Sequence, residues 1–346
     1  MKRNARPLDQ RATSYDVARL AGVSQSAVSR CFSAGASISA HTRTKVEAAA
    51  HRLGYQPNAL ARSLITERSG LVGFIVTDRT LHASPQIVHD LCDRLRAANL
   101  MPLFNTLRDE GAVGDLVPRI LAYRPEAIVS LATVERESIL QAARQGVPVV
   151  LVNRRVPAGA AATSIGCSQA QGIQRLTRRL IAAGHKRIAF IAGPKRAPVS
   201  EERLEGFRAA MRDAKLTPVD IVHADYAYAS GRAAALDLVR RRPRPDALVC
   251  ANDAMAIGAL DACRFDLGLS VPDAISVTGF DDIAEGSHPT NGLTTVRQPT
   301  AAIADDVVTM LARLTDGTAG EHHTRRFDGL LIERTSARLA AAHDAV

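Results

Sequence analysis

The sequence lacks the features that mark a membrane-bound or exported protein. Its 346 residues contain no apolar run of about 18 residues, the length that a membrane-spanning helix requires. The opening segment, residues 1–14, has basic side chains but no apolar core of the kind found in signal peptides. These absences predict a protein of the cytoplasm.

The familiar signatures of metal and enzyme sites are also missing. The five cysteines are odd in number, scattered and never spaced C-x-x-C, which argues against a disulfide framework or a zinc cluster. The histidines show no metal-ligand spacing, and the G-x-G-x-x-G, G-x-x-x-x-G-K-[ST], H-E-x-x-H and G-x-S-x-G motifs are absent. Asp281 and Asp282 are adjacent carboxylates, but no second acid or base accompanies them, so a ligand-holding or structural role fits them better. We expect no metal, no cofactor and no catalysis.

Acidic residues are scarce in the first fifth of the chain. Residues 1–69 hold 11 basic and 4 acidic side chains, whereas the rest of the chain holds 33 and 31. Only five of the 44 cations are lysines, so arginine abundance is a property of the whole chain and is not informative by itself. The local shortage of acids predicts a surface that binds phosphates.

The first sixty residues show the pattern of a helix-turn-helix. Thr13 and Asp16 form a capping pair that predicts a helix beginning near Ser14. Gly22 then allows a turn, and Ser24 caps a second helix. A third helix is expected from a cap at Ser39 to Gly54.

A short segment follows this unit. Tyr55-Gln56-Pro57 ends the unit, and residues 58–64 show a brief helical pattern before a polar stretch. Seven residues are too few for a stable isolated helix. If the segment becomes helical, it must dock against a partner.

From residue 70 the sequence alternates between apolar strand runs and amphipathic helices. This texture predicts an α/β fold in which helices cover parallel sheets, and two similar β/α series predict two lobes with a cleft between them. Ligands bind such sheets at the carboxyl ends of the strands. The predicted buried strands are Leu71–Val76, Ala127–Leu131, Val147–Val152, Ile188–Ala192, Ala247–Cys250 and Ile275–Gly279.

A dense, ordered set of residues spans about fifty positions of the amino-terminal unit. It comprises Ser14-Tyr15-Asp16-Val17-Ala18, Ala21-Gly22-Val23-Ser24, Val28-Ser29-Arg30, Thr42-Arg43 and Leu53-Gly54-Tyr55-x-Pro57-Asn58. This set resembles the headpiece of the LacI family of transcriptional regulators, and the resemblance extends over nearly all of the remaining chain. It implies a helix-turn-helix headpiece at 1–56, a hinge helix and linker at 57–69, a two-lobed periplasmic-binding-protein-like core at 70–338 and a tail at 339–346.

The second helix of the headpiece presents short polar and cationic groups that can reach base edges and phosphates in a major groove. These groups are Gln25, Ser26, Ser29 and Arg30. The resemblance gives base-reading roles to Gln25 and Ser26, and a base or phosphate contact to Arg30. It places the phosphate backbone against Thr13, Tyr15 and Ser24.

The resemblance also assigns a function to residues 58–64. This segment, which begins at Asn58, matches the family hinge helix that folds in the minor groove. Leu64 matches the leucine wedged between the central base pairs, and Ala61 lies beside it. Apolar wedges of this kind kink DNA.

In the core, the resemblance implies a pocket for a small effector. Arg203, Tyr226, Asn252 and Asp281 match residues that bind or stack on the ligand, and the segment 81–88 lines the pocket. The set is Ala83, Ser84, Asn153, Arg203, Tyr226, Asn252 and Asp281. An aromatic face, a bidentate cation, an amide and a carboxylate suit vicinal hydroxyl groups, so a sugar or sugar acid is expected.

Some positions depart from the family pattern. Ala83 and Ser84 stand where many relatives carry two aromatic residues, Ser168-Gln169 stands where an Asp-Asn pair is common, and Asn153 replaces a frequent Asp. These departures leave the identity of the ligand open. The tail lacks the leucine repeat of tetrameric relatives, which favours a homodimer.

The sequence therefore predicts a cytoplasmic, nucleoid-associated transcriptional regulator, most simply a repressor. It is expected to bind pseudo-palindromic operator DNA as a dimer under the control of a small effector. Two other classes stay open. A secreted sugar-binding protein shares the core but begins with a signal peptide, and an enzyme working in the cleft needs a catalytic group that the sequence does not show.

Overall fold

The computed structural model describes residues 12–32, 36–58, 68–108, 110–318 and 323–341. The chain divides into two compact units, Met1–Ser69 and Gly70–Val346. Each unit is described by itself. No helix within the described ranges combines the length and the apolar character needed to cross a membrane.

The first unit contains a helix-turn-helix followed by a third helix. The helices are α1 (Ser14–Ala21), α2 (Gln25–Cys31) and α3 (Ala40–Leu53). The predicted capping residues all act as caps. Thr13 and Asp16 form a complete capping box, the Ser24 hydroxyl accepts from the amide of Ala27, and Gly22 and Gly54 end their helices with left-handed φ angles of 67° and 61°.

A small apolar core holds these helices together. Val17, Val28 and Val46 are fully buried, one from each helix. Arg43 of α3 also donates from Nη1 to the carbonyl oxygen of Cys31 at 3.0 Å, which ties the carboxyl end of α2 to α3. This packing leaves the polar side of α2 exposed.

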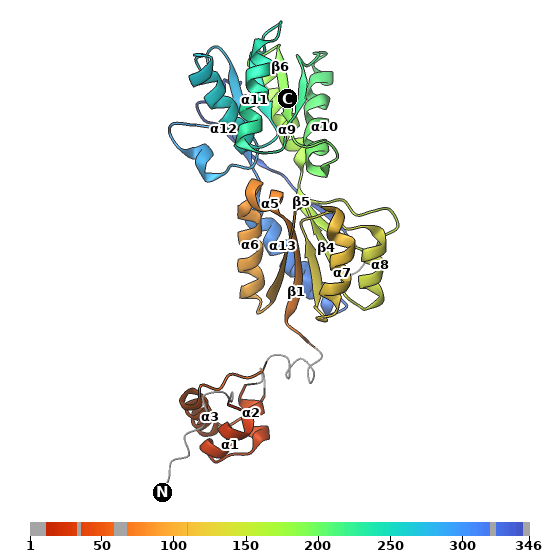
Figure 1. Cartoon of the computed structure of the whole chain (residues 1–346), viewed down its shortest axis with the longest axis vertical. Helices are drawn as coiled ribbons and strands as arrows, with labels where there is room; N and C mark the ends of the chain where they lie inside the picture. Colours follow the sequence, from red (N-terminus) through yellow and green to blue (C-terminus); the bar gives the residue numbers. More distant parts are fainter. Residues whose placement is uncertain (1–11, 33–35, 59–67, 109, 319–322, 342–346) are drawn as a thin grey trace. The chain divides into compact units, whose positions relative to one another are not determined.

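The second unit has two lobes, each built around a parallel sheet (Figure 1). Lobe 1 contains a six-stranded sheet in the order β11-β5-β4-β3-β1-β2, with every neighbouring pair parallel. Its strands are β1 (Leu71–Thr77), β2 (Met101–Leu107), β3 (Ala127–Ser130), β4 (Val149–Val152), β5 (Thr163–Cys167) and β11 (Thr324–Phe327).

Helices cover both faces of the lobe 1 sheet. Phe74 points to the face that packs against α6 and α13, and Ile75 points to the opposite face with α7 and α8, because successive strand residues alternate between faces. The helical segments are α5 (Asp78–Ala83), α6 (Pro85–Ala97), η1 (Glu110–Ala112), α7 (Val113–Leu121), α8 (Arg136–Arg144) and α13 (Thr300–Thr315).

Lobe 2 contains a four-stranded parallel sheet in the order β7-β6-β8-β9. Helices α9 and α10 pack together, as do α11 and α12 (Figure 1). The elements are α9 (Gln169–Ala182), β6 (Ile188–Ala192), α10 (Pro198–Asp213), β7 (Ile221–His223), α11 (Tyr228–Arg240), β8 (Ala247–Cys250), α12 (Asp253–Asp261), η2 (Ala262–Asp266), β9 (Ser276–Thr278) and η3 (Ala284–Ser287).

The chain passes between the lobes in the segments β5 to α9, β9 to α13 and β11 to β12. A two-stranded antiparallel pair, β10 (Thr295–Arg297) and β12 (Leu330–Ile332), belongs to these crossings and was not predicted. Residues beyond the predicted core limit at 338 also pack on lobe 2, since Leu339 contacts its apolar core and the carbonyl of Ala340 accepts from Arg179.

The predicted α/β architecture is confirmed, and each predicted strand run contains a strand. The structure adds strands that carry no comparable apolar run. Among them, β2 is a half-exposed edge strand, and β5 is fully buried but consists mostly of small residues. Both belong to the lobe 1 sheet.

Candidate nucleic-acid interface and ligand pocket

The exposed side of α2 carries the side chains predicted to meet DNA. Gln25, Ser26, Ser29 and Arg30 are all exposed, and Ala27 and Val28 between them are buried. Gln25 Nε2 donates to Ser14 Oγ at 3.3 Å, and Arg30 Nε donates to the carbonyl oxygen of Ser26 at 3.4 Å. The helix thus presents one polar and cationic face of the size that enters a major groove.

The residues predicted to hold phosphates lie at the amino ends of the first two helices. Both hydroxyls serve as caps, because Thr13 Oγ1 accepts from the backbone amide of Asp16 at 3.3 Å and Ser24 Oγ accepts from that of Ala27 at 3.2 Å. The Thr13 hydroxyl also donates to Asp16 Oδ2 at 2.7 Å, and Ser24 Oγ lies 2.9 Å from Ser26 Oγ. Tyr15 is 68% exposed, which is unusual for a large aromatic residue. Helix amino ends attract phosphate because their amides and dipoles point outward.

The predicted hinge falls mostly outside the described residues. Asn58 is described and exposed. Ala61 and Leu64 lie outside the described residues, so their predicted contacts stay predictions.

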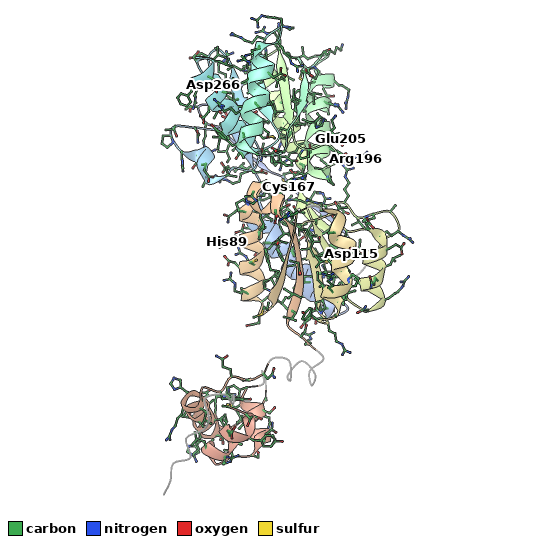
Figure 2. All side chains as sticks on the ribbon, viewed as in Figure 1. His89, Asp115, Cys167, Arg196, Glu205 and Asp266 are labelled. Atoms are coloured by element: carbon green, nitrogen blue, oxygen red, sulfur yellow. The ribbon has the colours of Figure 1, made fainter. Side chains whose placement is uncertain are left out.

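The second unit contains a cavity of about 260 Å³ between its two lobes. Every residue predicted for effector binding lines this one cavity: Ala83, Ser84, Asn153, Arg203, Tyr226, Asn252 and Asp281. Cys167, at the end of β5, lies where the lobes meet (Figure 2).

Strand ends explain why these residues converge. Asn153 follows β4, Tyr226 follows β7, Asn252 follows β8 and Asp281 follows β9. In a parallel sheet the carboxyl ends of all strands meet at one edge, and the two sheets point these edges at the same cavity.

A buried ion pair forms one wall of the pocket. Arg203 Nη2 donates to Asp281 Oδ1 at 2.8 Å, and the two side chains are only 3% and 5% exposed. Arg203 also stacks on Phe280, with its guanidinium carbon 3.9 Å from the ring centre. Burial raises the pKa of Asp281, and the guanidinium opposes that shift. The second carboxylate oxygen of Asp281, Oδ2, accepts no hydrogen bond within the described part of the chain, so it remains available to a ligand hydroxyl.

A chain of amides extends this pair across the crossings between the lobes. Gln169 Oε1 accepts from Arg203 Nε at 2.9 Å, and Gln298 Nε2 donates to Asp281 Oδ1 at 2.7 Å. Asn153 Nδ2 donates to Gln298 Oε1 at 3.2 Å, which an aspartate at this position could not do. The departure at Asn153 therefore fits the other amides of this network.

Backbone strain is concentrated at the pocket. Asn153, Arg196, Tyr226 and Asp281 line it with positive φ angles of 52°, 67°, 73° and 118°. Gly166 is needed beside Asn153, because a Cβ at Gly166 would lie 2.4 Å from Asn153 Oδ1. Residues held in disfavoured backbone conformations gather at functional sites.

Sequence reasoning missed several lining residues. Gln298 follows the short strand β10, which shows no apolar run. Five other missed residues are cationic: Arg79, Arg108, Arg154, Lys195 and Arg196. Arg108 directly follows β2 and Arg154 lies two residues after β4, so the strand-end rule applied to every strand would have found them. Tyr226 is the one aromatic residue among the lining residues that the structure describes, as the small Ala83 and Ser84 imply.

The described residues contain no cluster of histidine, cysteine or acidic side chains able to hold a metal. A helix-turn-helix with an exposed polar face, on a chain whose second unit has a ligand pocket between two α/β lobes, defines a DNA-binding regulator.

Comparison with known proteins identifies the family. Residues 13–58 match the model of bacterial regulatory proteins of the lacI family, and residues 177–337 match that of the periplasmic binding protein-like domain. The chain is 31% identical to the HTH-type transcriptional regulator AscG of Escherichia coli (strain K12) over 334 residues, covering 94% of this chain and 98% of AscG. It is 34% identical to the ribose operon repressor of the same strain, covering 94% and 100%. The chain belongs to the lacI family.

The fold of the whole chain agrees with this assignment. A crystal structure of the lac repressor dimer bound to operator and the anti-inducer ONPF matches with a TM-score of 0.84 and 29% identity, covering 94% of this chain and 99% of that one. The protein is a DNA-binding transcriptional regulator with a periplasmic-binding-protein-like core.

Proposed function

We propose that this protein is a cytoplasmic, nucleoid-associated repressor whose dimer binds a pseudo-palindromic operator and responds to a small polar effector. The observation that carries the proposal is the convergence of every predicted effector residue on one cavity between the lobes. The ribose operon repressor and the lac repressor structure with operator and anti-inducer support it by similarity.

On the DNA side, α2 enters the major groove. Gln25 and Ser26 read base edges, Ser29 and Arg30 contact bases or phosphates, and the exposed positions of all these side chains suit the roles. Phosphates bind at the helix amino ends beside Thr13, Tyr15 and Ser24. The hinge residues Asn58, Ala61 and Leu64 occupy the minor groove, with Leu64 as the wedge.

In the pocket, Arg203 and Asn252 donate hydrogen bonds to the effector, and the free oxygen of Asp281 accepts one. Tyr226 supplies an apolar ring face. Asn153 lies on the crossing between the lobes, and Ala83 with Ser84 leaves room beside the amino end of α6. This arrangement of donors and acceptors fits a polyhydroxylated ligand.

The pocket is suited to binding and not to catalysis. Asp281 is the one carboxylate among the described lining residues, and its Oδ1 is committed to Arg203 and Gln298. General acid–base chemistry needs a freely titrating group near the substrate. We therefore assign the cavity an allosteric role.

Coupling between effector binding and operator binding follows from the chain segments that cross between the lobes. A ligand that contacts both lobes shifts their relative position, and the amide network spans the segments that must move. Because allosteric coupling is reciprocal, operator DNA must change effector affinity by the same factor.

The proposal is tested by selecting operator sequences from random DNA with the full-length protein and measuring binding by fluorescence anisotropy. We expect a two-fold symmetric site bound at least about 1,000-fold more tightly than random DNA at physiological salt. Selection of an asymmetric site, or no preference over random DNA, would overturn it.

A further inference from the structure

The lining of the cavity carries a large excess of positive charge. Among the described lining residues, the cationic side chains are Arg79, Arg108, Arg154, Lys195, Arg196 and Arg203, and the one carboxylate belongs to Asp281. Asp281 and Arg203 neutralise each other through their 2.8 Å hydrogen bond. Among the other cations, Arg79, Arg108, Lys195 and Arg196 have no acid to balance them within the described part of the lining.

Most of these cations are exposed and uncommitted. Arg79, Arg108, Lys195 and Arg196 are exposed, and none of them forms a hydrogen bond or ion pair within the described ranges. A nearby acid outside the lining, Asp225, accepts hydrogen bonds from the Ser230 hydroxyl and the amide of Ala227. These hydrogen bonds lower the pKa of Asp225, and the positive charge of Arg79 lowers it by a smaller amount. The electrostatic interaction between Asp225 and Arg79 is therefore weak.

The cations come from both lobes. Arg79 and Arg108 follow β1 and β2 of lobe 1, whereas Lys195 and Arg196 follow β6 of lobe 2. Figure 2 shows Arg196 on lobe 2, near the side that faces lobe 1. Like charges on opposite walls repel one another, so approach of the lobes is opposed until an anion lies between them.

Helix ends add to this positive field. The first residue or the N-cap of α6, α9, α10 and α12 lines the cavity. Each helix therefore points the positive end of its dipole toward the ligand. The N-cap residues of α6, α9 and α10 make no side-chain cap bond, which leaves first-turn amides without a side-chain acceptor.

We propose that the effector is an anionic polyol, in which a carboxylate or phosphate lies between the cations of the two lobes and the hydroxyl groups meet Arg203, Asn252 and Asp281. This inference rests on the proposed function and specifies the chemical class of its ligand. The charged group bridges the lobes, so the anion itself provides the attraction that closes the cleft. The volume of about 260 Å³ lies near the lower end of ligand pockets and suits a single sugar unit.

Matched triplets of ligands test the proposal at constant ionic strength. Each triplet contains a neutral sugar, its acid and its phosphate: ribose, ribonate and ribose 5-phosphate; glucose, gluconate and glucose 6-phosphate; galactose, galacturonate and galactose 6-phosphate. Inorganic phosphate and sulfate control for anion effects that need no polyol. Thermal shift and calorimetric titration of the full-length protein are the readouts.

We expect an anionic member of at least one triplet to raise Tm by several degrees and to bind about tenfold or more tightly than its neutral parent. The carboxylate and phosphate arms identify which anion is preferred. Neutral sugars that bind as well as their anions would overturn the proposal, and so would a panel in which no anionic sugar raises Tm above the inorganic anions.

Charge-reversal variants locate the effect. Arg108→Glu and Lys195→Glu, one from each lobe, should each weaken binding of the anionic ligand by about fivefold or more. Arg144→Glu is the matched control, because Arg144 is an exposed arginine on α8 outside the cavity. Unliganded Tm checks that each variant is folded. Equal affinity in all three variants would contradict the assignment.

The outcomes separate this inference from the proposed function. If a neutral sugar releases operator DNA and the charge reversals have no effect, the anionic effector is wrong and the repressor assignment stands. If the protein shows no sequence-specific DNA binding, the repressor assignment fails whatever the ligand panel shows.

Discussion

Arg203 and Asp281 lie on different elements of lobe 2 and meet through a 2.8 Å hydrogen bond from Nη2 to Oδ1, almost fully shielded from solvent. The pair is tied to the crossings between the lobes, since Gln169 accepts from Arg203 and Gln298 donates to Asp281. A ligand that engages either member therefore acts on groups that are bonded to the segments crossing between the lobes.

Removing one partner of this pair should cost more stability than removing both. Arg203→Met leaves the Asp281 carboxylate buried without its cation, which costs about 3–5 kcal/mol. In the double variant Arg203→Met/Asp281→Asn no uncompensated charge remains, so we expect it to be more stable than Arg203→Met alone. Urea unfolding of the three proteins measures this difference. A double variant that is less stable than the single variant would contradict the coupling.

Asp253 predicts a pH dependence of stability. Burial, followed by the charge of Asp281, raises its pKa from 3.8 to about 7, and Thr295 Oγ1 and the amide of Ile283 oppose the shift by donating to the carboxylate. Because the folded state holds the proton more tightly, the contribution of this group is complete below about pH 4 and is lost as the pH rises through about 7.

The matched variant is Asp253→Asn, which keeps an acceptor oxygen and removes the titration. The slope of unfolding free energy between pH 5 and pH 7 should differ from that of the parent by up to about 1.4 kcal/mol per pH unit. Parallel stability curves for the two proteins would show that Asp253 does not titrate in this range.

The N-cap of α2, Ser24, and its first residue, Gln25, should separate helix stability from the reading of DNA bases. Ser24→Ala removes the cap on the amide of Ala27, 3.2 Å away, and should cost about 1 kcal/mol of local stability. Hydrogen exchange of residues 24–32 reports that loss. Gln25→Ala should leave exchange unchanged but reduce operator discrimination by about 1–3 kcal/mol. Faster exchange in Gln25→Ala together with lost operator discrimination in Ser24→Ala alone would contradict both assignments.

The proposed wedge gives a prediction for the hinge. Leu64→Ala should weaken binding to the selected operator far more than binding to random DNA, because the wedge acts only where the central step is kinked. Anisotropy titrations on both DNAs at one salt concentration make the comparison. An equal loss of affinity for the two DNAs would contradict the assignment of Leu64 as a wedge in the minor groove.

The sequence predicted the elements whose pattern matches their surroundings. Residues 188–192 form an apolar run because β6 is buried on both faces. Thr13, Ser24 and Gly54 mark helix ends because their side chains or backbone conformations suit capping positions. In contrast, α12 is apolar on nearly all sides and shows little amphipathic periodicity. The sequence pattern therefore did not predict this helix.

The site was predicted less evenly. Residues such as Arg203 and Asp281 stand in recognisable motifs, and the structure brings them together. The cations did not stand out, because arginine is abundant throughout the chain and only the fold shows which arginines face the cavity. Gln298 was missed for a similar reason, because it accepts hydrogen bonds from the side-chain amides of Asn153 and Gln169, which are distant in sequence.

Reciprocal linkage tests the central claim, that the cavity controls operator affinity. The measurement is the Kd of the full-length protein for its selected operator, with and without the sugar ligand that the thermal-shift panel identifies, and the Kd for that ligand with and without operator. We predict that both constants change by the same factor, about tenfold or more. A ligand that saturates the cavity while the operator Kd stays unchanged would contradict it.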